Sequence, residues 1–321
     1  MFKRTTLSFV YIFTLLCIGI FSSPLVSLAQ AGKQAIKTIV IDAGHGGNDP
    51  GAIGEYSNEA QLTLQMALKL GKKLQDVIPG VNIVYTRTNE NLPGDVNNKN
   101  EANRLRAKIA NEARGDLFVS IHVNSLAPKY RNVPNGTRKE TYYVTTGKGK
   151  KKKRVAKTRT VTAYKRVRIP ETVTGTETYI WAVGKNDQKK QFVQDESGEQ
   201  ADSSFQFFDT PEAYIKASLL TAKYFKNSQL AAELVEEEFA TLGRPSYGVK
   251  QRNHQGIWVL QATAMPSILV ETGFICTPED EAYLNSEKGQ DQLTESMKNA
   301  ILKYKAALES GTIKGVQSQG K

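Results

Sequence analysis

Short apolar runs alternate with segments of helical periodicity along the chain from residue 38 onward. Residues 38–42 form a β-branched run that ends in a glycine-rich loop, which is typical of a buried strand. Residues 59–75 carry apolar side chains at helical spacing, and Asn58 before them is a suitable N-cap. The same patterns predict a strand over residues 81–86, a helix over 98–112 and a strand over 116–123.

The C-terminal half continues this alternation. Thr210 and Pro211 are typical of a helix start, and the helix is expected to continue, with a break near Asn227, as far as Leu242. Buried strands are predicted at residues 256–260 and 267–270, and an amphipathic helix at 291–307. Strands that alternate with helices predict an α/β fold: a single domain with a mostly parallel sheet flanked by helices.

The first 29 residues have the pattern of a secretory signal peptide. Lys3 and Arg4 precede a short apolar run, and Ser27 and Ala29 are small residues at the expected cleavage site. An uncleaved membrane anchor is the alternative, although the run is short for a membrane span. We therefore expect an exported protein (periplasm, or extracellular and cell wall), with one domain over residues 36–308 and a disordered tail over 309–321.

Export also bears on the cysteines, because only Cys276 remains after cleavage and no internal disulfide is expected.

The positive charge of the chain is concentrated in one segment. The whole chain has a formal net charge of +11. Residues 129–174 contain 15 Lys or Arg against two Glu, a net +13, so the remainder is slightly acidic at −2. This segment is β-prone but irregular, and we interpret it as an inserted basic arm or hairpin. Contact with an anionic wall polymer or anionic lipid is one hypothesis, and a solvated loop without a partner is the other. Export argues against nucleic acid.

Histidine is scarce, with three in the chain, and two of them follow predicted strands. His45 comes at the end of the first strand and His122 at the end of the third. Carboxyl ends of parallel strands meet at one sheet edge, where the sites of such folds form. Glu59 begins the helix after the His45 loop and can reach that edge. Two imidazoles and one carboxylate form a known catalytic zinc set, which predicts Zn²⁺ as cofactor.

Glu271 ends the apolar run 268–270 and is therefore a charge at the end of a buried strand. Burial of an unpaired carboxylate is costly, which favours a functional role as the proton-transferring group of a zinc hydrolase. Each residue also has a structural explanation: a strand-end histidine, an N-terminal helix charge for Glu59, or a salt-bridge partner for Glu271. The third histidine, His254, lies in a polar stretch and is either a loop residue or a substrate contact.

Four phrases of the sequence resemble the zinc-dependent N-acetylmuramoyl-L-alanine amidases. They are residues 41–52 (IDAGHGGNDPGA), 85–87 (YTR), 118–124 (FVSIHVN) and 266–275 (PSILVETGFI), in family order and spacing. The resemblance implies a twisted six-stranded sheet, zinc held by His45, Glu59 and His122, and Glu271 as the catalytic residue. It also implies hydrolysis of the amide between N-acetylmuramic acid and L-alanine of the peptidoglycan stem peptide. Asn124, Arg87 and Lys250 are the candidate substrate-binding residues.

Two features depart from the family pattern, and a third segment is a candidate for a feature of some members. The helix start at Glu59 is a loose match, so Glu55 remains a competitor as metal ligand. The basic insertion 129–174 is not typical of the family. Some members carry an inserted helix that blocks the site until a protein activator removes it, and residues 185–209 with the following helix are candidates for it, as is an ordinary surface loop.

The sequence is also compatible with two other functions. One is a zinc peptidase or deacetylase that uses the same metal on another amide. The other is a non-catalytic wall-binding protein, which the basic arm favours and the complete ligand set with Glu271 argues against.

Overall fold

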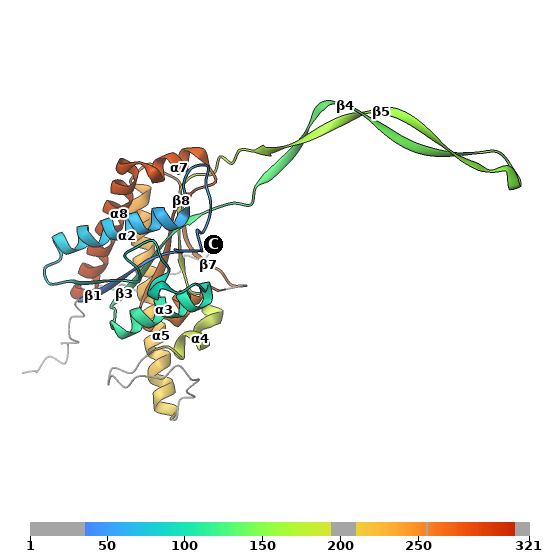
Figure 1. Ribbon diagram of the computed structural model, residues 1–321. Coiled ribbons are helices and arrows are strands. Elements are labelled where there is room, and N and C mark those ends of the chain that lie inside the picture. Colours follow the sequence, from blue (N-terminus) through green and yellow to red (C-terminus); the bar gives the residue numbers. More distant parts are fainter. Residues whose placement is uncertain (1–35, 194–209, 255, 312–321) are drawn as a thin grey trace, which may run out of the picture. The chain divides into compact units, whose positions relative to one another are not determined.

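The computed structural model describes residues 36–193, 210–254 and 256–311 of the chain (Figure 1). The larger compact unit is Ile36–Ala306, and the other combines Met1–Ala35 with Ala307–Lys321. The predicted signal peptide and most of the candidate blocking segment 185–209 therefore lie outside the described residues. Within those residues, no helix is both long and apolar enough to span a bilayer.

Six strands form one sheet in the order β2-β1-β3-β8-β6-β7. All neighbours in it run parallel except β6 and β8, which are antiparallel. This confirms the predicted six-stranded, mostly parallel sheet. The strands are β1 (Thr38–Ala43), β2 (Asn82–Tyr85), β3 (Leu117–Asn124), β6 (Thr176–Ile180), β7 (Ser246–Gln251) and β8 (Ser267–Phe274).

Three of the long helices begin where the sequence supplies a capping side chain. The side chain of Asn58 accepts a hydrogen bond from the Gln61 amide, and Asn98 and Thr210 cap two later helices in the same way. The helices are α2 (Glu59–Val77), α3 (Lys99–Glu112), α4 (Asn186–Lys190), α5 (Pro211–Ala240), α6 (Trp258–Ala262), α7 (Pro278–Asn285) and α8 (Glu287–Ser310), with short 3₁₀ turns η1 (Pro93–Asp95), η2 (Gly149–Lys151) and η3 (Val183–Lys185).

Three sequence predictions differ from the structure. The apolar run predicted as a strand at 256–260 is the short helix α6, because a brief apolar run fits a buried helix as well as a strand. α5 is continuous through Asn227, which is buried, and its neighbour Ser228 accepts a hydrogen bond from the Ser267 amide at 2.7 Å. α8 extends to Ser310, two residues into the predicted tail.

The sheet is buried on both faces, as expected for parallel strands between helices. On one face Val40, Phe118 and Leu269 belong to a core that also includes Trp181 and Leu260. Residues that alternate with them along the same strands point to the other face and are also inaccessible to solvent. These are Ile39, Ile41, Val119, Ile121, Ile268 and Val270. The charged residues at the ends of these strands are therefore held on a rigid frame.

The basic insertion is a long antiparallel hairpin formed by β4 (Lys129–Thr146) and β5 (Lys153–Ile169). These strands pair only with each other, and no residue in either strand is buried. Figure 1 shows them as one extended ribbon. The predicted basic arm is confirmed. A two-stranded ribbon without a packed face is marginally stable in water, so the hairpin presents an uncovered surface.

Candidate metal centre and active site

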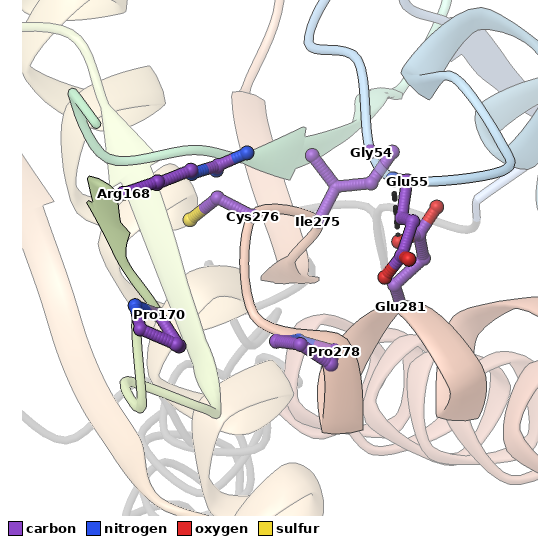
Figure 2. Close-up of a pocket in the computed structure, with 8 residues that line it drawn as sticks. All are labelled: Gly54, Glu55, Arg168, Pro170, Ile275, Cys276, Pro278 and Glu281. Atoms are coloured by element: carbon purple, nitrogen blue, oxygen red, sulfur yellow. Dashed lines mark hydrogen bonds between the residues drawn. The ribbon is translucent and has the colours of Figure 1, made fainter. Parts of the chain in front are cut away.

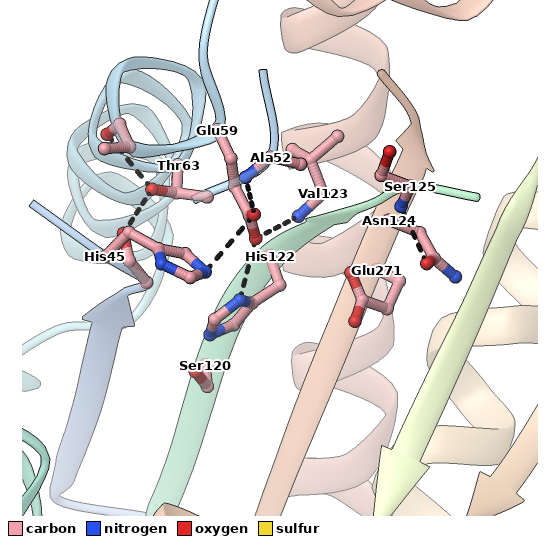
Figure 3. Close-up of polar contacts among 12 residues, drawn as sticks. His45, Ala52, Glu59, Thr63, Ser120, His122, Val123, Asn124, Ser125 and Glu271 are labelled. Atoms are coloured by element: carbon pink, nitrogen blue, oxygen red, sulfur yellow. Dashed lines mark hydrogen bonds and ion pairs between the residues drawn. The ribbon is translucent and has the colours of Figure 1, made fainter. Parts of the chain in front are cut away.

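Three side chains from separate elements converge at the carboxyl edge of the sheet. His45 follows β1, Glu59 begins α2 and His122 lies near the end of β3, and one ligand atom of each falls within 4.8 Å of the others. His45 Nε2 lies 3.2 Å from Glu59 Oε2, and His122 Nδ1 lies 2.8 Å from Glu59 Oε1. Figure 3 shows both rings turned toward the Glu59 carboxylate. The residues expected to bind the metal are therefore side by side, and Glu55 is not among them.

The Glu59 carboxylate is almost fully buried and is held from two sides by the backbone. The Ala52 amide donates to Oε2 at 2.8 Å and the Val123 amide donates to Oε1 at 3.0 Å. Burial alone would raise the pKa of Glu59, but hydrogen bonds from His122 and His45 outweigh it and hold that pKa well below its usual range. Glu59 therefore stays ionised, as a carboxylate ligand must be.

Asp49 orients His45 from the side away from Glu59. Its Oδ2 lies 2.8 Å from His45 Nδ1, and Lys99 Nζ lies 3.1 Å from the same oxygen. Burial would lower the pKa of His45, but Glu59 and then Asp49 outweigh it and raise that pKa. A histidine that donates from Nδ1 to a carboxylate has Nε2 free for a metal, a pairing that is common among metal ligands.

Two glycines make the close approach of these groups possible. A Cβ atom at Gly51 would lie 2.5 Å from Glu59 Oε2, and its φ of +67° is in the left-handed region. A Cβ atom at Gly44 would lie 2.5 Å from His122 Nε2. The glycine-rich loop is therefore required by the packing of the ligands as well as by its turns.

A buried polar network holds the His45 loop from below. Asp42 accepts hydrogen bonds from the Thr86 and Ser120 hydroxyl groups, each at 2.6 Å, and forms an ion pair with Arg106. Arg106 also donates to the His45 carbonyl oxygen at 2.6 Å. His45 has a φ of 61°, which is unusual for a residue other than glycine, and these contacts stabilise that conformation.

Arg87 belongs to this scaffold and corrects one expectation. It is 5% exposed, and its guanidinium donates to the carbonyl oxygens of Ala43, Gly44 and Ala60 at 2.7–2.9 Å. With its donors directed to the backbone in the interior, Arg87 does not face a substrate. We assign it a positioning role beneath the loop in place of the predicted substrate contact.

Glu271 lies on β8 directly beside His122, which is its register partner on β3 (Figure 3). It is 6% exposed, and its Oε2 has no hydrogen-bond partner in the described structure. Burial, followed by the charge of Glu59, raises the pKa of Glu271 to about 8. The Arg252 guanidinium, 3.5 Å from Oε1, acts in the opposite direction. A carboxyl group with a free oxygen and a raised pKa is suited to exchange protons near neutral pH.

Glu177 is a buried carboxylate that sequence reasoning missed. It is the register partner of Glu271 on β6, it accepts a hydrogen bond from Asn124 Nδ2 at 2.6 Å, and it forms an ion pair with Lys250. The Tyr179 hydroxyl donates to it at 2.7 Å. Two predicted substrate-binding residues, Asn124 and Lys250, are thus brought next to Glu271 through a shared partner.

The sequence held only partial signals for the missed residues. Asp49 stands four positions after His45 in the glycine-rich phrase, a spacing that alone does not identify a pair. Glu177 lies in a strand-like phrase, but a single strand does not reveal which neighbour faces it. Arg106 is an ordinary helix residue by pattern. His254, left open between loop and substrate contact, is exposed in a turn after β7.

The sequence profile of the N-acetylmuramoyl-L-alanine amidases matches residues 39–303. The chain belongs to this family. The resemblance and the enzyme class expected from the motifs, an amidase that hydrolyses peptidoglycan, are thereby confirmed. The match spans β1 to α8, and the residues of the basic hairpin lie within that span.

Several known proteins are similar to this chain over most of its length. An uncharacterized protein of Bacillus subtilis, YqiI, is 35% identical over 84% of this chain and 84% of its own length. A putative N-acetylmuramoyl-L-alanine amidase of Buchnera aphidicola is 26% identical over 83% of this chain and 95% of its own. Among solved structures, the CwlD amidase from Clostridioides difficile, in complex with the GerS lipoprotein, has a TM-score of 0.52 at 21% identity and covers 84% of this chain and 99% of its own. This last likeness supports the fold.

Proposed function

We propose that the chain hydrolyses the amide between N-acetylmuramic acid and L-alanine of the stem peptide, with Zn²⁺ bound by His45, Glu59 and His122. The convergence of these three side chains within 4.8 Å carries the proposal. Two imidazoles and one carboxylate fit Zn²⁺ and leave a coordination position for substrate or water. Zinc supplies a Lewis acid that activates water and polarises the scissile carbonyl.

The residues of the chain supply the remaining chemistry. Asp49 and the amides of Ala52 and Val123 orient the ligands through the contacts described above. Glu271 is the general base, because its Oε2 is unpartnered and it stands beside His122. The same carboxyl group then returns the proton to the leaving amine. Asn124 and Lys250 are proposed as substrate contacts.

Replacement of Glu271 tests this assignment of roles. Glu271→Ala is expected to lower kcat by at least about 100-fold, since general acid–base groups typically contribute 10²–10⁴. Zinc content measured by elemental analysis is expected to equal that of the wild type. Glu279→Ala, an exposed glutamate on α7, is the matched control. Full activity in the Glu271 variant would refute the mechanism.

Digestion of purified sacculi distinguishes the proposed reaction from other zinc amidase chemistry. Mass spectrometry of the products, with and without a chelator, is expected to show glycan chains freed of intact stem peptides, and only without the chelator. Cleavage within the stem peptide would indicate a peptidase, and loss of acetyl groups a deacetylase. Binding without any release would support the non-catalytic function.

The basic hairpin is proposed to bind an anionic wall polymer. Its strand register places basic side chains on both faces of the ribbon: Lys129, Arg131, Arg138, Lys153, Lys157, Arg159 and Lys165 on one, and Lys139, Arg154, Arg166 and Arg168 on the other. A flexible polyanion can contact both faces, whereas a planar lipid surface contacts one. Three tyrosines of the ribbon, Tyr130, Tyr142 and Tyr143, already stack against arginines, so they are not free to insert into lipid.

Deletion of residues 145–174 is the simplest test of this proposal, but it removes all of β5 and leaves the rest of β4 without its partner. Charge reversal at the hairpin tip (Lys150, Lys151 and Lys152 to Glu) keeps the ribbon. It is expected to weaken sacculus binding and to flatten its dependence on salt. Unchanged binding and salt dependence would contradict the idea. Binding to vesicles with anionic lipid, but not to sacculi, would point to lipid as the partner.

A protein activator and an exported location complete the proposal. The neighbouring CwlD structure contains a lipoprotein partner, which supports a search for an activator of this chain. Members of the family act on the cell wall, which supports export to the periplasm or beyond the cell surface. Co-purification from the cell envelope and fractionation of the cell would test the two statements separately.

A further inference from the structure

A hollow with a volume of about 330 Å³ lies at the same edge of the sheet as the candidate metal ligands. Three segments form its walls: the turn at residues 54–57 that leads into Glu59, the loop at 275–278 that follows Glu271 on β8, and the end of β5 with Arg168 and Pro170. This volume is within the range of small-molecule sites and accommodates a residue of a peptide.

Hydrogen bonds hold two walls of the hollow in place, the turn at residues 54–57 and the loop at 275–278. Glu281 accepts hydrogen bonds from the amides of Glu55, Tyr56 and Ser57 at 2.7–3.0 Å and from the Ser57 hydroxyl at 2.8 Å. Thr277 donates to the Val173 carbonyl oxygen at 2.7 Å and so ties the loop after β8 to the exit of the hairpin. Glu281 is fully occupied by these contacts and is not available to a ligand.

Two opposite charges in the hollow are free of partners. Within the described residues, neither the Arg168 guanidinium nor the Glu55 carboxylate has a hydrogen bond or an ion pair. Figure 2 shows Arg168 reaching toward Ile275 and Gly54, with Glu55 beyond them. Between the charges the walls are apolar, with Pro170, Ile275 and Pro278. The arrangement suits a short aliphatic chain that ends in an ammonium and a carboxylate.

The short chain segment between Glu271 and Ile275 limits how far the hollow can lie from the candidate active site. Ile275 is four residues beyond Glu271, so the two are at most about 13 Å apart along an extended chain. An extended peptide advances about 3.3–3.6 Å per residue, so a peptide cut beside Glu271 reaches the hollow with its third or fourth residue.

We infer that this hollow binds the third residue of the stem peptide, a diamino acid whose free side-chain ammonium pairs with Glu55 and whose carboxylate pairs with Arg168. The inference rests on the proposed amidase function. It gives the hairpin a second role, because Arg168 at its base recognises the substrate peptide. It also predicts a preference for stem peptides that are not cross-linked, since cross-linking acylates that amine and removes its charge.

The test compares two soluble substrates: N-acetylmuramoyl dipeptide, and N-acetylmuramoyl tripeptide with diaminopimelic acid as the third residue. The wild type is expected to have a kcat/KM about tenfold higher for the tripeptide, the effect of one or two charged hydrogen bonds at a half-open site. Arg168→Ala and Glu55→Ala are expected to lower this ratio toward one. Acetylation of the diaminopimelic side-chain amine is expected to lower it in the wild type, with no further effect of Glu55→Ala.

Arg104→Ala is the matched control, since it removes one positive charge from an exposed position on α3 that does not line the hollow. It is expected to keep the wild-type ratio. If both substrates are cut and the ratio is the same in Arg168→Ala, Glu55→Ala and Arg104→Ala, the inference is wrong while the amidase function stands. If the zinc-loaded wild type cuts neither substrate, both the inference and the proposed function are overturned.

Discussion

Gly51 offers a direct test of how the metal ligands are assembled. Replacement by alanine places a Cβ atom 2.5 Å from Glu59 Oε2, 2.8 Å from Glu59 Cβ and 2.8 Å from His45 Cδ2. All three atoms belong to proposed zinc ligands, so the substitution acts on the site itself. Gly80 is a matched control because its φ of +73° is similar to the +67° of Gly51, yet a Cβ atom there meets nothing within 4 Å.

The two substitutions share one cost and differ in the other. A non-glycine residue in the left-handed region costs about 1–2 kcal/mol, and this applies to both positions. Overpacking in a dense environment adds about 1–3 kcal/mol at Gly51 alone. We therefore expect Gly80→Ala to destabilise the protein by about 1–2 kcal/mol and Gly51→Ala by about 2–5 kcal/mol.

Urea denaturation of the metal-free proteins measures the stability difference, and competition with a chelator measures zinc affinity. Glu59 must move to accommodate the Gly51→Ala methyl group, so zinc affinity is expected to fall at least about tenfold, as it does when ligand orientation is disturbed. Gly80→Ala is expected to leave it unchanged. Equal losses of stability in the two variants, with equal zinc affinity, would refute the packing argument.

Two further predictions concern groups beside and away from the site. Asp49→Ala should lower zinc affinity about 10–100-fold, because the contact to His45 Nδ1 is lost, and Asp49→Asn should have an intermediate effect. The same chelator competition measures both variants, and Asp76→Ala, at an exposed position on α2, serves as control. Lys189 is fully buried, donates only to carbonyl and hydroxyl oxygens, and has a pKa well below 10.5 because of burial. Since the unfolded chain binds this proton more readily, stability should rise with pH between the lowered pKa and about 10.5, by up to about 1.4 kcal/mol per pH unit. The free energy of unfolding of the wild type minus that of Lys189→Met, measured by urea denaturation, should therefore increase from pH 7 to pH 9. A difference that does not change with pH would contradict this prediction.

Local signals in the sequence predicted most of the architecture. Asn58 and Asn98 mark helix starts because a side-chain cap needs only its own first turn. The apolar runs of β1, β3 and β8 predict buried parallel strands because both faces of such strands are covered. The strand predicted at 256–260 is wrong, because a short apolar run has no periodicity that distinguishes a strand from a helix. The helix α6 is stabilised by residues far away in the sequence, such as Lys189, which donates to the Leu260 carbonyl oxygen.

The candidate site also combines residues that local signals indicate with residues that only the folded chain brings together. His45 and His122 are predicted to lie together because the ends of parallel strands meet at one edge of the sheet, and Glu59 because its helix begins beside that edge. Glu177 was missed because its partners Asn124 and Lys250 lie 53 and 73 residues away in the chain. Arg87 was recognised as part of a motif but given the wrong role, because a motif does not reveal whether a guanidinium faces solvent or the backbone of its own loop.

The polar network beneath the site explains why the ligand residues alone do not define it. Burial of Asp42 and Arg106 is unfavourable for each group separately, and their ion pair only compensates that cost in part. The pair also fixes the position of Arg106, which donates a hydrogen bond to the His45 carbonyl oxygen. This contact stabilises His45 at a φ of 61°, a conformation that would otherwise be disfavoured. Arg87 does the same for Gly44, against which the His122 ring packs. The positions of both histidines therefore depend on two arginines that touch neither imidazole, and a chain with the three ligands but without these arginines would not hold the same geometry.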